Sequence, residues 1–127
     1  MSIAYLDTHV AVFLHDGLLE ELSSAAKLAI ETNELLVSPM VLLEFEYLHA
    51  RKKISVNARA LTAALAETFG VAVCAFPFPA VVNESLGLEW VSDPFDRLIV
   101  AHAAANRNSP LITRDRVIRR HYSSAVW

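Results

Sequence analysis

The sequence predicts a three-layer α/β/α domain with a central, mainly parallel sheet. Short apolar runs alternate with longer segments rich in alanine and leucine along the chain. This alternation is typical of parallel strands connected by helices that cover both faces of a sheet. The chain has 127 residues, of which 54% are hydrophobic, and this length is close to the commonest size of one domain. We therefore expect residues 1–127 to form a single domain.

The expected strands are four short apolar runs, IAYL at 3–6, ELLVS at 34–38, VAVCAF at 71–76 and PLITR at 110–114. Strands that are buried on both faces usually have this length and this apolar character. The expected helices are five longer segments, at 8–15, 23–32, 38–53, 55–70 and 96–108. Ser38 before Pro39 and Asp93 before Pro94 are typical helix starts, because each pairs an N-cap side chain with a proline at the first helical position.

Composition excludes several classes of protein. The chain has three glycines and no GxxxxGKS, GxxxxGKT or GxGxxG motif, so it lacks the common phosphate-binding loops. Its five histidines show no HExxH or other zinc spacing, and no serine stands in a GxSxG motif. Cys74 is the single cysteine, which is typical of a reducing compartment. No apolar run approaches the ~18 residues that cross a membrane, so we expect a cytoplasmic protein without membrane contact.

Charge is distributed unevenly along the chain, although the formal net charge is only −3. Before residue 51, Lys27 is the only lysine or arginine among eight acidic residues, whereas six arginines and one acid lie from Arg97 onward. The basic stretches ARKK at 50–53 and RDRVIRRHY at 114–122 are either solvated helix faces or rims that bind phosphate groups. The arginines considered for phosphate contact are Arg97, Arg114, Arg116 and Arg119. For Arg97, a salt bridge with a neighbouring carboxylate is the simpler expectation.

Four aspartates follow the predicted strands or open a predicted helix. Asp7 directly follows the run at 3–6, Asp115 follows LIT with one residue between, and Asp93 and Asp96 open a helix. In open α/β folds, ligands bind beyond the carboxyl ends of the strands, where loops and helix starts converge. We therefore expect these carboxylates at one edge of the sheet. Helix capping explains Asp93, but the helix dipole explains an acid at position 96 only in part.

A further candidate carboxylate lies in the predicted helix after VSP, where Glu44 and Glu46 compete. At about 100° per residue, Val41, Phe45 and Leu48 form the centre of the buried face of this helix. Glu44 borders Leu48 and points nearer to that face than Glu46 does. We therefore expect Glu44 to point inward and Glu46 to be solvated.

Carboxylates that converge on one spot repel one another, which raises their pKa values and reduces stability unless a cation lies between them. Hard oxygen ligands without cysteine suit Mg²⁺ or Mn²⁺, which complete their coordination shells with water and substrate phosphate. Such a cation lowers the pKa of an attacking water and stabilises charge on the leaving oxygen. The pattern therefore predicts a metal-dependent phosphodiesterase.

The order of these segments resembles a known family. YLDTH at the first strand, an acid in the helix after VSP, then SDPFDRLIVAHA and LITRD are similar to the PIN domain, and more narrowly to VapC-type toxins of bacterial and archaeal toxin–antitoxin pairs. The resemblance covers nearly the whole chain, and DPFDRLIVA is its most specific part. Leu43 and Ser92 depart from it, since many relatives have Trp and a His or Arg at these places, and this bears on substrate recognition.

This resemblance implies a PIN-like fold and a Mg²⁺- or Mn²⁺-dependent endoribonuclease. The catalytic acids would be Asp7, Glu44, Asp96 and Asp115. The metal ligands would be Asp7, Asp93, Asp96 and Asp115, and the Thr8 hydroxyl would support the metal shell. The four arginines named above would then be candidate RNA contacts.

The resemblance also implies partners. VapC-type toxins pair with themselves and are inhibited by a cognate antitoxin, so we expect a homodimer and an antitoxin partner. A hydrophobic content of 54% is compatible with this expectation, because it leaves apolar surface to cover.

Two other classes of function stay open. A PIN-like module that only binds RNA or a partner would be expected to have lost at least one of the four catalytic acids, yet all are present. An aspartate-nucleophile phosphatase would usually need a second aspartate two residues after Asp7, where His9 stands. Both alternatives therefore rank below the endoribonuclease.

Overall fold

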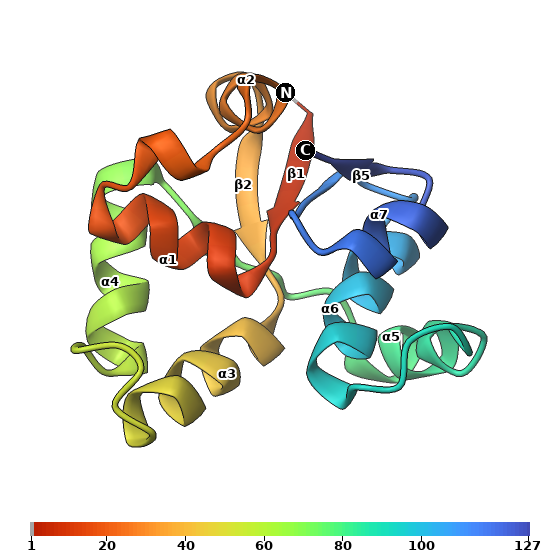
Figure 1. Ribbon diagram of the computed structural model, residues 1–127. Helices are drawn as coiled ribbons and strands as arrows, with labels where there is room; N and C mark the ends of the chain where they lie inside the picture. Colours follow the sequence, from red (N-terminus) through yellow and green to blue (C-terminus); the bar gives the residue numbers. More distant parts are fainter. Residues whose placement is uncertain (1) are drawn as a thin grey trace.

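In the computed structural model, which describes residues 2–127, a five-stranded parallel sheet forms the centre of the molecule (Figure 1). The spatial order of the strands is β3-β2-β1-β4-β5, so the first strand of the chain lies in the middle. Each pair of neighbouring strands is parallel. The strands are β1 (Ile3–Leu6), β2 (Glu34–Val37), β3 (Ala72–Val73), β4 (Leu111–Ile112) and β5 (Ala125–Val126).

Helices cover both faces of this sheet and confirm the predicted three-layer α/β/α architecture. In Figure 1, α1 and α4 lie on one side of β1 and β2, and α5, α6 and α7 lie on the other. The helices of the described residues are α1 (Thr8–Asp16), α2 (Ser24–Thr32), α3 (Pro39–Ala50), α4 (Ala58–Phe69), α5 (Phe78–Ser85), α6 (Pro94–Ala105), α7 (Arg116–His121) and the short 3-10 helix η1 (Leu19–Glu21). Among residues 2–127, no helix is both long enough and apolar enough to span a membrane.

The predicted strands and helices are all present, although β3 and β4 are shorter than the apolar runs that predicted them. The prediction missed four elements, α5, α7, β5 and η1. Helix α5 begins within the proline-rich stretch FPFP at 76–79, which carries no helical periodicity. The other three elements are too short for a periodic pattern. Tertiary packing rather than local sequence therefore determines these elements.

Side chains fix the helix starts next to the sheet. Ser38 is the N-cap of α3 and Asp93 is the N-cap of α6, and Pro39 and Pro94 occupy the first helical positions, as predicted. Asp115 caps α7 through a 2.9 Å bond that its Oδ1 accepts from the Ile118 amide. Acidic groups therefore stand at several helix starts, where backbone N–H groups lack partners within the helix.

The core lies between the sheet and the helices on both faces. Tyr5 and Leu6 of β1 are fully buried, as are Phe45 of α3 and Ile99 of α6. Helices α3 and α6 pack against each other, and the buried Ser38 Oγ lies 2.8 Å from Nδ1 of His102 on α6. This packing fixes the spacing of two helices that both carry candidate catalytic acids.

Candidate active site

The expected acids lie together at one cavity of about 560 Å³. The acidic side chains that line it are Asp7, Glu44, Asp93, Asp96 and Asp115. They come from the end of β1, the middle of α3, the start of α6 and the start of α7. The carboxyl ends of parallel strands meet at one edge of the sheet, so segments far apart in the sequence deliver their carboxylates to the same place. We call this cavity the acidic pocket.

Asp7 is the most deeply buried of these acids, with 6% of its surface exposed. Its Oδ1 accepts a 2.8 Å bond from the backbone N–H of Thr8, and its Oδ2 accepts a 2.6 Å bond from the hydroxyl of Thr113. Burial raises the pKa of Asp7 above its ordinary value, and these two bonds oppose the rise. Asp7 therefore has a fixed orientation in a place that disfavours an uncompensated negative charge.

Glu44 enters the pocket from α3. It is half-buried and accepts a hydrogen bond from the Thr8 hydroxyl, whereas Glu46 is exposed on the same helix. Burial raises the pKa of Glu44, the Thr8 bond opposes the rise, and the charge of Asp7 adds to it. The structure therefore places Glu44 inward and Glu46 outward, as helix geometry predicts.

Asp96 combines burial with the charges of the other acids. Burial, the largest cause, raises the pKa of Asp96, and the negative charges of Asp7, Asp93, Glu44 and Asp115 add to the rise. Together they raise this pKa from 3.8 to about 7. For a fully buried charge this rise would correspond to about 4 kcal/mol. Because Asp96 is only half-buried, screening by water reduces the figure to about 1–2 kcal/mol.

Asp93 and Asp115 combine a capping role with a place in the pocket. The Oδ1 of Asp93 accepts a 3.1 Å bond from the backbone N–H of Asp96, which confirms the predicted cap and holds the start of α6. The backbone N–H of Asp115 donates a 3.1 Å bond to the Thr113 hydroxyl, which in turn donates to Asp7. Thr113 thus connects two of the acids.

Thr113 was missed from the sequence, as were two residues that line the pocket, His9 and Trp127. Thr113 ends the apolar run before Asp115, and its place as a polar side chain at a strand end could have indicated its role. His9 is an exposed first-turn residue of α1, and its charge lowers the pKa of Asp7. The position of Trp127 in the pocket lining could not be predicted, because Trp127 belongs to no predicted helix or strand.

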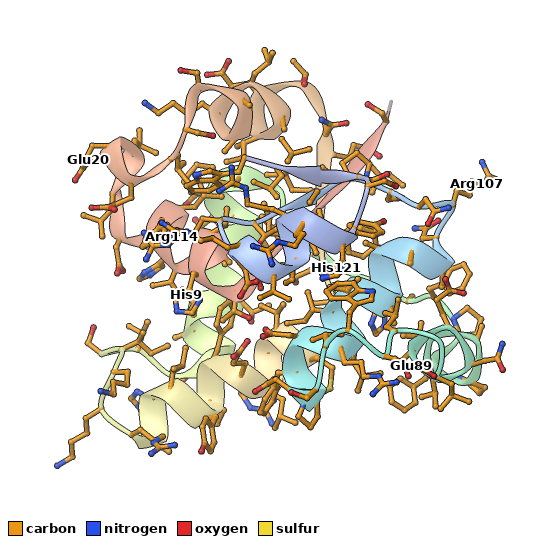
Figure 2. The ribbon with its side chains drawn as sticks, turned by 45° about the vertical axis from the view of Figure 1, so that its right-hand side comes forward. His9, Glu20, Glu89, Arg107, Arg114 and His121 are labelled. Atoms are coloured by element: carbon orange, nitrogen blue, oxygen red, sulfur yellow. The ribbon has the colours of Figure 1, made fainter. Side chains whose placement is uncertain are left out.

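Three of the four arginines considered for phosphate contact line the acidic pocket. Arg114, Arg116 and Arg119 line the acidic pocket, and Arg114 lies near His9 in Figure 2. Arg114 is also engaged elsewhere, because its guanidinium lies 4.8 Å from the centre of the Phe13 ring and 3.6 Å from the Glu21 carboxylate.

The expected salt bridge of Arg97 with a carboxylate is wrong. Its Nε donates a 2.7 Å bond to the carbonyl of Ser85, and a terminal nitrogen donates a 3.3 Å bond to the carbonyl of Leu86. Arg97 therefore ties α6 to the end of α5, and it is not among the residues that line the pocket.

The acidic pocket fits a hard divalent cation in its chemistry. Its possible ligands are carboxylate oxygens, and their mutual repulsion is the situation that a cation relieves. Within residues 2–127, no three His, Cys, Asp or Glu side chains are close enough to form a preassembled metal site. The carboxylates therefore surround a shared space rather than meet at one point, as expected for charges that repel.

Comparisons with known proteins identify the fold and the family. A structure of VapBC2 from Rickettsia felis bound to a DNA fragment from its promoter contains a chain with the same fold, at a TM-score of 0.63 and 20% sequence identity, over 93% of this chain and 92% of the other. No curated protein matches the sequence significantly. Residues 4–123 match the PIN domain. Since this match spans well over half of the chain, the protein belongs to the PIN domain family.

Proposed function

We propose that this protein is a Mg²⁺- or Mn²⁺-dependent endoribonuclease that acts as the toxin of a type II toxin–antitoxin pair. The observation that carries the proposal is the set of carboxylates gathered in one pocket, where burial and the neighbouring negative charges raise the pKa of Asp96. PIN domains are generally nucleases that depend on divalent metal ions, and this chain belongs to the family. A module that only binds RNA would gain nothing from holding these acids together.

The acids divide into two roles in the proposed reaction. Asp7, Asp93, Asp96 and Asp115 would hold the cation, which when bound lowers the pKa of the attacking water and offsets the charge on the scissile phosphate. The Thr8 hydroxyl, which donates to Glu44, keeps that carboxylate turned toward the pocket. Glu44 is then placed to orient the attacking water and accept its proton.

Substitution of a single acid tests the nuclease. Asp96→Asn should reduce Mg²⁺- or Mn²⁺-dependent cleavage of single-stranded RNA at least 100-fold, because a neutral amide weakens cation binding. The same change should raise the melting temperature in EDTA, since it removes a repelled charge. Cleavage is followed on labelled RNA by gel electrophoresis and stability by circular dichroism.

Glu46→Gln is the matched control, because Glu46 is an exposed acid on α3 that does not line the acidic pocket. It should cleave RNA like the wild type. Cleavage by Asp96→Asn at the wild-type rate, or cleavage that persists in EDTA, would show that the carboxylates are not the active site.

The arginines at the rim of the acidic pocket provide a second test. Arg116 and Arg119 are exposed on α7 and line the pocket, so we propose that they contact RNA phosphates. The double variant Arg116→Gln/Arg119→Gln should lower the salt dependence of RNA binding by a slope of about 1.4, at about 0.7 for each phosphate contact to a single strand. Arg120→Gln on the same helix is the control, and an unchanged slope in the double variant would assign this face to solvent.

Protein partners form the other part of the proposal. Exposed apolar side chains on α3, on α5 and directly after α5 would be covered by a second copy or by an antitoxin. They include Leu43, Tyr47, Phe78 and Leu86. An antitoxin arginine would be attracted to the acidic pocket, so antitoxin and cation should compete for it. A cytoplasmic location, where RNA is available, fits the same function.

Expression in bacteria tests the toxin role. The chain alone should arrest growth, co-expression with the protein encoded directly upstream should restore growth, and Asp7→Asn should be harmless without that partner. The purified chain should sediment as a dimer. A harmless wild-type chain that sediments as a monomer would contradict the toxin role while leaving the nuclease proposal to the cleavage assay.

A further inference from the structure

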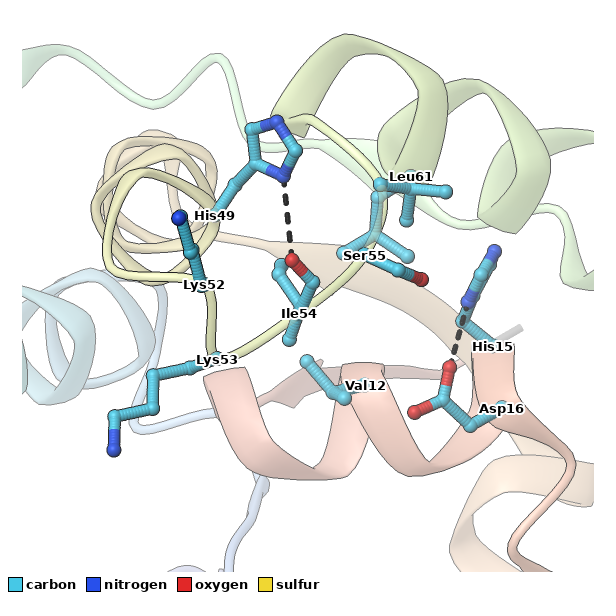
Figure 3. A pocket seen from close by; sticks show the side chains of 10 residues that line it. Val12, His15, Asp16, His49, Lys52, Lys53, Ile54, Ser55 and Leu61 are labelled. Atoms are coloured by element: carbon cyan, nitrogen blue, oxygen red, sulfur yellow. Dashed lines mark hydrogen bonds and ion pairs between the residues drawn. The ribbon is translucent and has the colours of Figure 1, made fainter.

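A second cavity of about 560 Å³ lies between the later parts of α1 and α3 and the segment that joins α3 to α4 (Figure 3). Figure 3 shows Ile54 and Ser55 between His49 on α3 and His15 on α1. The polar side chains that line the cavity are His15, Asp16, His49, Lys52, Lys53 and Ser55. We call it the basic pocket. Only part of the predicted basic stretch 50–53 lines this pocket, because Lys52 and Lys53 are among its lining residues and Arg51 is not.

The two lysines have no acidic partner. Within residues 2–127, neither Lys52 nor Lys53 forms an ion pair, and both are exposed. Asp16 is the acid in this lining, and its Oδ1 lies 3.0 Å from Nδ1 of His15 rather than beside either lysine. The pocket therefore offers two available ammonium groups.

The backbone holds these lysines in a defined place. The amide of Lys52 donates to the carbonyl of His49 and the amide of Lys53 donates to the carbonyl of Leu48, both at 2.9 Å. This pair of bonds is a Schellman motif that ends α3, and Lys52 occupies its left-handed position with φ of 60°. Glycine adopts this conformation most easily, yet the chain has a lysine there. The His49 ring lies 3.3 Å from the Ile54 carbonyl and closes the following loop.

The basic pocket lies along the same two helices as the acidic pocket. Helix α1 starts directly after Asp7 and reaches the basic pocket at His15, and α3 carries Glu44 before His49. At 1.5 Å of rise per residue, these separations correspond to about 8–12 Å. A strand whose bases stay stacked as in a duplex, with a rise of about 3.4 Å per nucleotide, covers this distance with two to four nucleotides.

We propose that the basic pocket binds a backbone phosphate of the RNA strand, two to four nucleotides away from the bond that is cleaved in the acidic pocket. The ammonium groups of Lys52 and Lys53 and the Ser55 hydroxyl supply the donors for this phosphate. The site deepens the proposed nuclease function and rests on it. A contact at this distance holds the strand across the active site without taking part in the chemistry.

Binding of RNA to the full chain in EDTA tests this site without requiring cleavage. The variants are Lys52→Gly and Lys53→Gln, and Lys27→Gln on α2 is the matched control, since Lys27 is exposed and lines neither pocket. The probes are a single-stranded RNA of about twelve nucleotides and a dinucleotide, whose single phosphodiester group cannot occupy both pockets at once. Fluorescence anisotropy at several salt concentrations gives the affinity and its salt slope.

Each variant should weaken binding of the long RNA about threefold or more and reduce its salt slope by about 0.7, while binding of the short RNA stays at the level of Lys27→Gln. Lys52→Gly should have a melting temperature equal to or above that of the wild type, because glycine suits the left-handed position. Its weaker binding would therefore not come from unfolding.

Three results would overturn the proposal. The first is binding of the long RNA by both variants with the affinity and slope of Lys27→Gln. The second is an equal loss for the short RNA, which would mean general attraction rather than a distant phosphate site. The third is competition by inorganic phosphate at the same concentration as by the long RNA, which would assign the pocket to a free anion. These binding measurements do not depend on RNA cleavage, which the Asp96→Asn variant tests. The basic-pocket proposal and the nuclease proposal can therefore fail separately.

Discussion

The gathering of partly buried, like-charged carboxylates at one edge of a parallel sheet is the constraint on which the rest of this structure depends. Parallel strands all end at the same edge, so the residues that follow them converge whatever their distance in the sequence. Asp7 is buried at the end of the central strand and has hydrogen bonds that fix it, while Asp96 faces it from α6 with a pKa raised to about 7. The fold keeps these groups together at a free-energy cost, and the cation that we propose would remove that cost on binding.

The surrounding elements hold the acids in place through short, local interactions. Asp93 caps the helix that carries Asp96, and the Thr8 hydroxyl contacts Glu44. The contact between α3 and α6 sets the distance between the helices that deliver these two acids. Capping groups, hydroxyls and helix packing therefore orient the carboxylates, which leaves the rim to the basic side chains that we propose contact RNA.

Local patterns in the sequence predicted the layers, the parallel sheet and the inward position of Glu44, because burial on both faces and helical periodicity are visible in a single segment. They could not predict α5 or α7, whose sequences are too short or too rich in proline to show a period. They also failed for Arg97. A salt bridge with a carboxylate was the expectation, but the guanidinium donates instead to two backbone carbonyls at the end of α5. Thr113 joins Asp7 to Asp115 only after β4 is paired with β1, and such contacts depend on the tertiary fold.

The most direct test of this account is the free energy of unfolding of the wild type and of Asp96→Asn, measured by urea denaturation between pH 5 and pH 8 with and without Mn²⁺. The folded-state pKa of Asp96 is raised from 3.8 to about 7, so the folded chain binds more protons than the unfolded chain in this window and stability falls as the pH rises. Without metal, the wild type should lose about 1–2 kcal/mol more than Asp96→Asn from pH 5 to pH 8, and Mn²⁺ should restore this loss in the wild type alone. Equal pH dependence in the two proteins, with no stabilisation of either by Mn²⁺, would contradict the account.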